Sequence, residues 1–194
     1  MIKTRKDLNR FLSEEKCFYR GYTGGLRGML SSLLYNGTST RIYRYVRLLR
    51  YTEYYHNNSY KITHKWSNIL NDIFMIYYRH KLEKLGALLG LEIGLNSCDC
   101  GLKIYHAGYL VVNYEARVGR NAKFHGCNCV GYSTSGVPII GDNVEFGVGS
   151  SVIGGVRIAD NIRIGAGAVV TKSYDEKNIV LAGVPARKLN RSTN

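Results

Sequence analysis

The stretch that decides the fold runs from residue 140 to residue 170 and reads IGDNVEFGVGSSVIGGVRIADNIRIGAGAVV. A bulky apolar residue recurs in it at every sixth position: Ile140, Phe146, Val152, Ile158, Ile164 and Val170. Counting back from Val130 gives the same step at Phe124, Val118 and Val112. A helix has a period of about 3.6 residues and a half-buried strand a period of 2, so neither produces a column at six.

The same stretch repeats itself over a longer distance. The segment Ile140-Gly-Asp-Asn-Val144 is matched 18 residues later by Ile158-Ala-Asp-Asn-Ile162. Three sixes per turn describe a three-sided coil whose bulky residues point inward, and each turn buries its apolar face by stacking on the next. The step from Val130 to Ile140 is ten residues, so we expect four extra residues within 131–139 to form an outward loop.

The first 90 residues have the helical period instead. Apolar spacing predicts helices over 5–20, over 26–35, from Thr38 or Ser39 onward, and from about 64 to 85, with a loop at 57–59. The residues expected to be buried are Ile42, Tyr45, Val46 and Leu49 in the third helix, and Trp66, Ile69, Leu70, Ile73, Phe74 and Tyr77 in the fourth. We therefore divide the chain into an α-helical N-terminal region at 1–90 and a repeat domain at 91–194.

The composition of the chain predicts a folded protein and a cellular compartment. The chain has 194 residues, of which 45% are apolar and 21% charged, which argues against disorder. Its longest apolar run is six residues, Ile73 to Tyr78, where a membrane span needs about 20. The N-terminus lacks the apolar segment of a secretory signal, and five cysteines are an odd set, so we expect reduced thiols and a cytoplasmic protein.

The net charge of +13 is concentrated in the helical region, where 16 Lys and Arg face 6 Asp and Glu. Arg41, Arg44, Arg47 and Arg50 recur there at every third residue. One interpretation is a solvated helix face; the other is a platform for an anionic glycan or for a lipid-linked precursor at the inner membrane surface. No RNA- or DNA-binding motif accompanies these arginines, so nucleic acid is not an expected partner.

The column at six resembles the hexapeptide repeat of the left-handed parallel β-helix acyltransferases. Ile164-Gly-Ala-Gly-Ala-Val-Val-Thr-Lys172, followed by Ala182-Gly-Val-Pro-Ala-Arg187, resembles their last coil and C-terminal strand. Glu92-Ile93 and Gly101-Leu-Lys-Ile-Tyr-His-Ala-Gly108 resemble two branches: serine O-acetyltransferase, and the O-acetyltransferases of capsule and exopolysaccharide sugars. The resemblance implies a left-handed β-helix, acetyl-CoA as donor and a homotrimer whose active sites use two chains.

Three positions separate the two branches. Tyr105 stands where serine acetyltransferases carry an Asp, and Gly136 and Val137 stand where they carry an Arg-His step that holds the amino acid. A zwitterion would leave its charges unpaired at such a site. We therefore predict an acetyl-CoA-dependent O-acetyltransferase acting on a sugar hydroxyl of a bacterial surface polysaccharide or its precursor. Serine O-acetyltransferase is the alternative, and a β-helix that has lost catalysis and serves as a scaffold is the third hypothesis.

The resemblance makes His106 the general base for direct acetyl transfer, without a covalent acyl-enzyme. His106 lies six residues before Val112, in the inward column, so a catalytic role predicts an irregular coil there. Glu92 stands where the family places its acid and is the predicted carboxylate partner, while Asp99 is a nearby carboxylate without a motif. His125 resembles no catalytic position, so we expect it to line a pocket or to form a structural hydrogen bond.

The donor site is also assigned by resemblance. The pantetheine arm of acetyl-CoA is expected along the coil edge, near Gly131, Tyr132, Val148 and Ala166. The phosphates call for cations, and Arg163, Lys172 and Arg187 lie near the last coils.

Two Cys-x-Cys pairs, Cys98/Cys100 and Cys127/Cys129, invite a zinc interpretation. Structural zinc sites favour wider spacing, and a γ-type carbonic anhydrase needs three coil histidines. We expect no metal.

Overall fold

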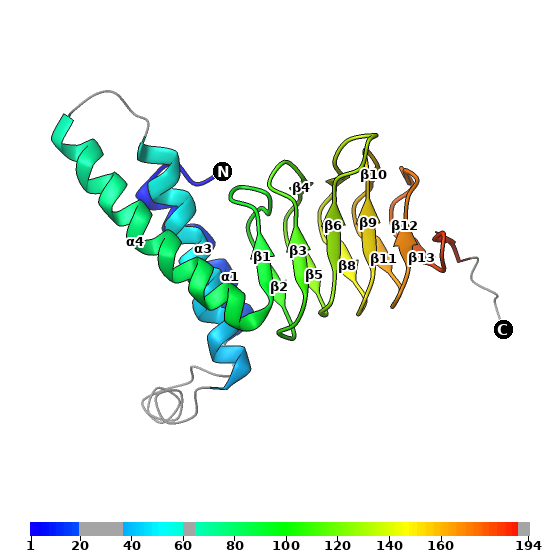
Figure 1. The fold of residues 1–194 in the computed structure, drawn as a ribbon. Coiled ribbons are helices and arrows are strands. Elements are labelled where there is room, and N and C mark those ends of the chain that lie inside the picture. Colours follow the sequence, from blue (N-terminus) through cyan, green and yellow to red (C-terminus); the bar gives the residue numbers. More distant parts are fainter. Residues whose placement is uncertain (20–36, 60–64, 190–194) are drawn as a thin grey trace. The chain divides into compact units, whose positions relative to one another are not determined.

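A computed structural model gives the structure of the protein and describes residues 1–19, 37–59 and 65–189, without the side chains of 65–68. The chain divides into two compact units, Met1–Leu91 and Glu92–Asn194, which are a helical unit and a coil of short strands (Figure 1). The helix predicted over 26–35 and the side chain of Trp66 lie outside the described residues.

The helical unit contains α1 (Arg5–Phe18), α3 (Thr38–Ser59) and α4 (Lys65–Leu89). The predicted loop at 57–59 is wrong, because α3 continues through Ser59. Asn58 Nδ2 and Ser59 Oγ donate to the carbonyl oxygens of Tyr54 and Tyr55, at 2.7 and 2.8 Å, so these loop-favouring side chains bond one turn back inside the helix. α4 ends at Leu89, and the next residue, Gly90, has a φ of 68°.

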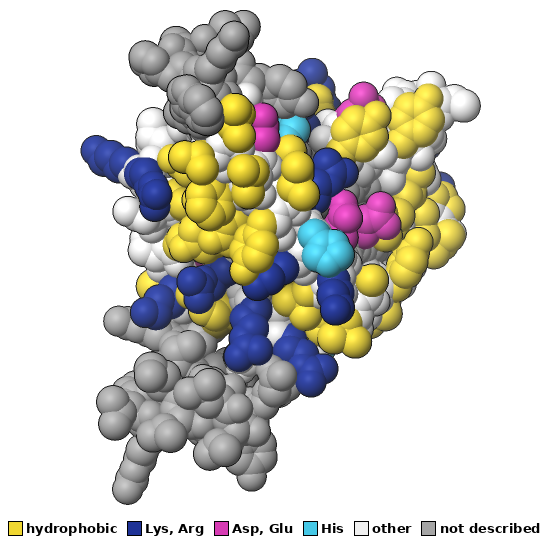
Figure 2. Space-filling model, turned by 60° about the vertical axis from the view of Figure 1, so that its left-hand side comes forward, with side chains coloured by type: hydrophobic (Ala, Val, Ile, Leu, Met, Phe, Trp, Pro, Cys, Tyr) yellow, Lys and Arg dark blue, Asp and Glu magenta, His cyan; other side chains and the backbone are white. Residues whose placement is uncertain are grey.

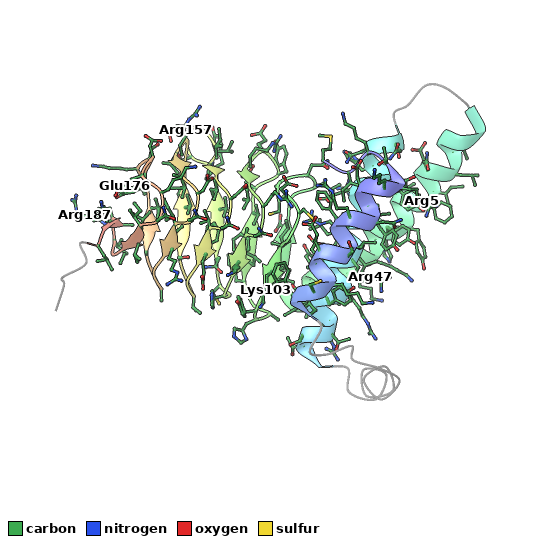
Figure 3. The ribbon with its side chains drawn as sticks, turned by 180° about the vertical axis from the view of Figure 1, so that it is seen from behind. Arg5, Arg47, Lys103, Arg157, Glu176 and Arg187 are labelled. Carbon is green, nitrogen blue, oxygen red and sulfur yellow. The ribbon has the colours of Figure 1, made fainter. Side chains whose placement is uncertain are left out.

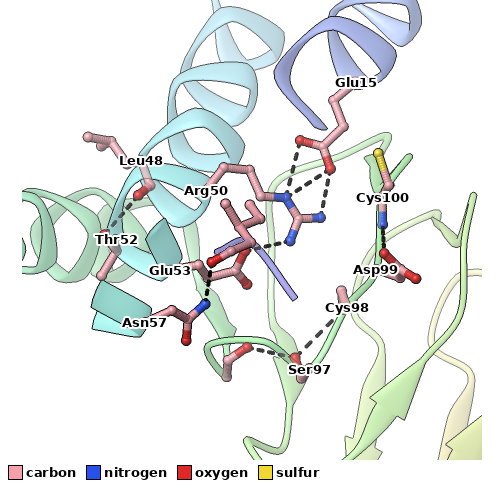
Figure 4. A network of polar contacts seen from close by, with 12 residues as sticks. Glu15, Leu48, Arg50, Thr52, Glu53, Asn57, Ser97, Cys98, Asp99 and Cys100 are labelled. Atoms are coloured by element: carbon pink, nitrogen blue, oxygen red, sulfur yellow. Dashed lines mark hydrogen bonds and ion pairs between the residues drawn. The ribbon is translucent and has the colours of Figure 1, made fainter. Parts of the chain in front are cut away.

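The predicted apolar face of α3 is confirmed, since Ile42, Tyr45, Val46 and Leu49 are all buried. Arg50 is also fully buried, and it donates to Glu15 of α1 at 2.6 Å and to Glu53 at 2.9 Å (Figure 4). Burial alone would lower the pKa of Arg50, but Glu53 and Glu15 together raise it well above its ordinary value.

The predicted surface row of four arginines is therefore wrong at Arg50. Arg44 and Arg47 are exposed and Arg41 is half-buried. The helix turns by about 100° per residue, so two positions nine residues apart point in opposite directions. A spacing of three cannot keep Arg41 and Arg50 on one face.

The predicted buried face of α4 is also wrong. Its members are 43–57% exposed: Ile69, Leu70, Ile73, Phe74 and Tyr77. Of these, Phe74 does stack on Tyr55 of α3, at 5.2 Å. Tyr78, outside the predicted face, stacks on both Tyr51 and Tyr55, and Leu82 and Leu89 are buried. Figure 2 shows apolar side chains gathered on one face, bordered in part by Lys and Arg. No helix among the described residues is long and apolar enough to cross a membrane.

The coil is a parallel β-solenoid of about five turns that matches a left-handed β-helix, as predicted. Its five-stranded sheet contains β1 (Leu91–Ile93), β3 (Leu110–Val112), β6 (Cys129–Gly131), β9 (Ser151–Ile153) and β12 (Val169–Val170). The three-stranded sheet contains β4 (Arg117–Val118), β7 (Ile139–Ile140) and β10 (Arg157–Ile158). The six-stranded sheet contains β2 (Lys103–Ile104), β5 (Lys123–Phe124), β8 (Glu145–Phe146), β11 (Arg163–Ile164), β13 (Val180–Ala182) and β14 (Arg187–Lys188).

The ten residues of the predicted column are all buried. Each lies next to a column residue on the adjacent turn, and the rings of Phe124 and Phe146 stack at 4.4 Å. The loop after Val130 absorbs its four extra residues without shifting the register, since Val118 still pairs with Ile140. Ser133 and Gly136 close this loop by exchanging two backbone hydrogen bonds.

Asparagines stiffen one corner of the coil. Asn121, Asn143 and Asn161 all have φ near 60°, a region that asparagine tolerates better than most residues. Their side chains form a ladder, in which Asn121 donates to Asn143 at 2.9 Å and Asn143 donates to Asn161 at 3.0 Å. The turns are thus held in fixed register, which fixes the positions of the outward side chains.

Candidate active site

His106 leaves the inward column because the coil is irregular around it. Ile104 and Val112, both buried, are eight residues apart instead of six. The two extra residues carry the segment 105–109 outward, and His106 is exposed. The irregularity that a catalytic His106 predicted is therefore present.

The segment 105–109 lies where the chain passes from the six-stranded to the five-stranded sheet. The same passage is made by residues 125–128, 147–150 and 165–168 on later turns, and we call this edge the His106 corner. Gly126 lies directly beside His106, because a Cβ placed on Gly126 would be 3.5 Å from the Cβ of His106. Small residues thus leave the imidazole accessible on the outside of the coil.

Glu92 lies on β1 and is exposed on the outer face of the five-stranded sheet. Among the described residues, no hydrogen bond or ion pair joins Glu92 to His106, and neither side chain has another such partner. Glu92 as the carboxylate partner of His106 stays a prediction.

The carboxylate–histidine pair that the structure does contain is His125 with Glu145. His125 Nε2 and Glu145 Oε1 are 2.8 Å apart, and both side chains are about one-third exposed, at 31% and 30%. His125 directly follows β5 and Glu145 lies on the adjacent strand β8, and Phe124 of β5 lies next to Phe146 of β8. Lys123 and Glu145 occupy neighbouring outward positions in the same register.

Further side chains extend this pair across the outer face of the six-stranded sheet. The ring of Tyr105 stacks on the ring of His125 at 4.3 Å, and Lys103 Nζ lies 4.3 Å from the centroid of Tyr105. Arg163 Nε lies 3.9 Å from Glu145 Oε2. A continuous series of contacts therefore crosses four strands, beginning at Lys103 (Figure 3) and ending at Arg163.

The sequence contained a pattern that could have located this pair. With the four-residue loop counted, the turn from Phe124 to Phe146 is 22 residues long. That count puts Glu145 beside Lys123 and within diagonal reach of His125, on the same outer face. We expected only a pocket-lining or structural role for His125, because it matched no family motif.

The predicted donor-site residues fall in several places on one chain. Val148 and Ala166 are exposed at the His106 corner. Gly131, Tyr132 and Lys172 lie at the opposite edge of the five-stranded sheet: Gly131 is the last residue of β6, Tyr132 follows it, and Lys172 comes shortly after β12.

The remaining two predicted donor-site residues lie on the six-stranded sheet. Arg163 is exposed on β11, and Arg187 is exposed on β14 at the end of the coil (Figure 3). Within one chain, the predicted donor-site residues therefore lie at both edges of the five-stranded sheet and on the six-stranded sheet. They do not gather at one place.

The cysteines of the coil are free thiols. Cys98 and Cys100 are buried in the coil, while Cys127 is exposed at the His106 corner. Burial raises the pKa of the Cys129 thiol above its usual value. Within the described part of the chain, no group of three His, Cys, Asp or Glu side chains could hold a metal ion.

Comparison with known sequences finds no match, either to a family model or to a curated protein. Comparison with solved structures does find matches. Serine acetyltransferase from Neisseria gonorrhoeae, in complex with serine, superposes with a TM-score of 0.62 at 22% identity, over 94% of this chain and 69% of its own. The chain has the fold of the serine acetyltransferases.

Two further structures agree with this result. Serine acetyltransferase from Brucella abortus strain S19, in complex with coenzyme A, gives a TM-score of 0.61 at 21% identity, over 95% of this chain and 68% of its own. A serine acetyltransferase in complex with CoA gives 0.64 at 17% identity, over 93% and 70%. At these identities the likeness is one of fold, and it extends over the helical unit as well as the coil.

Proposed function

We propose that this chain is an acetyl-CoA-dependent O-acetyltransferase. The observation that carries the proposal is an exposed histidine, His106, at an edge of a coil whose fold is that of serine acetyltransferases, including CoA-bound ones. An imidazole that is neutral near pH 7 can take the proton of a hydroxyl group. A histidine displaced from the core of the coil into solvent is available for that task.

The proposed reaction is a direct transfer. His106 takes the proton of the acceptor hydroxyl while its oxygen forms a bond to the thioester carbonyl carbon. The carbonyl oxygen becomes an oxyanion, which backbone N–H groups at the coil edge stabilise. When the C–S bond breaks, the imidazolium of His106 returns the proton to the CoA thiolate. We keep Glu92 as the proposed carboxylate that orients His106.

The donor site is proposed to lie between two chains of a homotrimer. Val148 and Ala166 lie on one edge of the coil, and Gly131, Tyr132 and Lys172 on another, so a cleft formed by neighbouring chains would bring the two groups together. Its phosphate contacts would come from cations of the outer surface. A monomeric enzyme with full activity would contradict this part of the proposal.

Arg163 and Arg187 complete the proposed phosphate contacts alongside Lys172. Arg163 is 76% exposed and only loosely paired with Glu145, at 3.9 Å, so its guanidinium can bind a phosphate group.

The proposed acceptor is a hydroxyl compound, and it has two candidates: L-serine and a sugar. L-Serine is favoured by the structural neighbours, because they are serine acetyltransferases and one is bound to serine. A sugar hydroxyl of a surface polysaccharide or its precursor, our expectation from the sequence, finds no support among those neighbours. It rests on the residues of this chain alone.

Those residues are Tyr105, Gly136 and Val137. Tyr105 has no carboxylate that could bind the amino group of serine. Its ring is stacked on His125 and lies beside the ammonium of Lys103. Gly136 sits in a tight turn with φ of 115° and offers no side chain for a carboxylate. Both features favour an acceptor without a zwitterionic centre.

A second proposed contact concerns Arg41, Arg44 and Arg47 of α3, as a site for an anionic glycan or for the inner face of a cytoplasmic membrane. Two of the three are exposed. Unchanged binding to anionic vesicles and to glycan after their replacement by Ser would remove this idea.

The deciding experiment measures thiol release from acetyl-CoA by wild type and by His106→Ala. The acceptors are L-serine, methyl glycosides, nucleotide sugars and bacterial oligosaccharides. We expect turnover with one acceptor class and a loss of roughly 10²- to 10⁴-fold in His106→Ala, the usual contribution of a general base. Turnover with serine alone would make the protein a serine acetyltransferase. CoA binding without turnover on any acceptor would favour the scaffold hypothesis instead.

A further inference from the structure

The outer face of the six-stranded sheet holds an imidazole that is already oriented. Glu145 fixes one ring nitrogen of His125, at 2.8 Å from Nε2, and Tyr105 fixes the plane of the ring by stacking on it at 4.3 Å and 15°. A side chain held at one edge and one face loses little entropy when it binds a further group. His106, by contrast, has no hydrogen-bond partner among the described residues.

His125 of this pair lies on the turn next to the one that carries His106. Tyr105 precedes His106 in the chain, and Gly126 follows His125, with its Cβ position 3.5 Å from the Cβ of His106. β2 and β5 are neighbouring strands, so the two histidines come from adjacent turns of the coil. A molecule bound at His106 therefore lies within reach of the outer face that carries His125.

The chemistry of the contact leaves one nitrogen available. An ionised carboxylate only accepts hydrogen bonds, so Nε2 of a neutral His125 carries the proton, and the Nε2–H group donates a hydrogen bond to Glu145. Nδ1 then keeps its lone pair, and no hydrogen bond to Nδ1 exists among the described residues. Nδ1 is thus a hydrogen-bond acceptor with a fixed direction. A hydroxyl group is its natural donor.

We propose that His125, oriented by Glu145, binds the acceptor through a second hydroxyl group, next to the hydroxyl that His106 deprotonates. This inference rests on the proposed acetyl transfer and deepens it: the acceptor class is a polyhydroxylated compound such as a sugar, in which two neighbouring hydroxyls can reach two histidines. His125 binds the acceptor, and Glu145 is a positioning residue that acts through His125.

The test uses His125→Phe, which keeps a ring to stack on Tyr105 and removes both nitrogens. Acceptor kinetics are measured with acetyl-CoA and the methyl glycosides of D-glucose, D-galactose and D-mannose, and with L-serine. We expect the KM for the best glycoside to rise roughly ten-fold to a hundred-fold, the range for losing one well-placed hydrogen bond, with the KM for acetyl-CoA unchanged. Glu145→Gln should shift the same KM in the same direction, by less.

Two comparisons make the result specific. His80→Phe, on an exposed position of α4, is the matched control and should leave every constant unchanged. Monodeoxy analogues of the best glycoside supply the second: one of them should be poor with wild type and no worse than its parent with His125→Phe, because the lost hydroxyl and the lost nitrogen are partners.

The outcomes separate this inference from the proposed function. If wild type acetylates a glycoside, His106→Ala is inactive and His125→Phe keeps the acceptor KM, the proposed function stands and the inference fails. A fall in kcat with an unchanged acceptor KM in His125→Phe also overturns it, as does turnover with L-serine alone. If no hydroxyl compound is acetylated, the proposed function itself fails and the inference falls with it.

Discussion

The two units of this protein bury their side chains under different rules. In the coil, each inward residue meets the inward residue of the next turn, as Phe124 meets Phe146, so burial follows from a count along the chain. In the helical unit, Arg50 meets Glu15 from another helix, 35 positions away. In a repeat, the buried positions can be predicted by counting along the chain. In a helix, the apolar pattern gives the period, but it does not show which face packs against another part of the protein.

The units also differ in where they place charge. The described part of the coil keeps its charged side chains at the surface, where Glu145, His125 and Arg163 remain partly exposed. The helical unit encloses a guanidinium between two carboxylates that are almost fully buried. Substitution of the buried charges should therefore affect stability in the helical unit, and substitution of the charges on the outer face of the six-stranded sheet should affect activity in the coil.

The largest effect on stability is expected from Arg50→Met. It removes the guanidinium that pairs with the buried carboxylates of Glu15 and Glu53, and breaking a buried ion pair by removing one partner costs about 3–5 kcal/mol. Urea unfolding followed by the fluorescence of Trp66, the single tryptophan, measures this loss in the helical unit. Arg47→Met is the matched control, since Arg47 is exposed and lies over the ring of Tyr43, at 5.9 Å from its centroid. It should cost about 1 kcal/mol or less, and equal losses in the two variants would contradict the distinction.

In the coil, the corresponding substitution is Ile158→Ala. Ile158 is 3% exposed in the inward column, and truncation of such a residue costs about 2–5 kcal/mol. Its neighbour Arg157 points outward from the same strand, so Arg157→Ala should change stability by about 0.5 kcal/mol or less. Hydrogen exchange of the amides of β7 and β10 measures both. Similar losses at the two positions would mean that the six-residue count does not govern burial.

The same contrast explains what could be predicted from the sequence. The column at six predicted the coil, its ten inward residues and the outward loop at 131–139, because each depends on counting. The count does not predict the position of His106. Two extra residues after Ile104 move His106 out of the inward column, and only a family resemblance suggested that they were there.

The contacts between helices could not be predicted from the sequence. The pattern in α4 gave the correct period, yet the rings that stack on α3 are those of Phe74 and Tyr78, while Ile69 and Ile73 are exposed. Which face is covered depends on partners from elsewhere in the chain, and no local count contains them. His125 with Glu145 is an intermediate case, since the register needed to pair them was present in the repeat.

A smaller effect is expected at the start of α1. Thr4 Oγ1 accepts from the backbone N–H of Asp7 at 3.0 Å, and the Asp7 carboxylate accepts from the Thr4 backbone N–H at 2.9 Å, which forms a capping box. Thr4→Ala should cost about 0.5–2 kcal/mol. Thermal unfolding followed by circular dichroism measures the loss, and Thr4→Ser, which keeps the hydroxyl, should restore most of the stability.

The capping box also predicts a dependence on pH. The hydroxyl and the backbone N–H of Thr4 hold the pKa of Asp7 below its usual value of 3.8. A lowered carboxyl pKa adds stability above pH 3.8, and that contribution is lost as the pH falls through the folded-state value below 3.8. The difference between wild type and Asp7→Asn should therefore shrink in acid. A difference that stays constant from pH 6 down to pH 2 would show that the charge of Asp7 does not contribute.

The smallest effect is expected from Ile73→Ser, on the apolar face of α4 that the sequence placed in the core. Ile73 is 55% exposed, and Ile and Ser have similar helix propensities, so the change in unfolding free energy should be about 0.5 kcal/mol or less. Leu82→Ala, nine residues further along the same helix and 7% exposed, should cost about 2–5 kcal/mol in the same urea titration. If Ile73→Ser instead costs as much as Leu82→Ala, this face is covered in the protein in solution. The helical unit would then be stabilised by a contact that its own described residues do not supply, and the coil alone would follow the rule that burial can be counted along the chain.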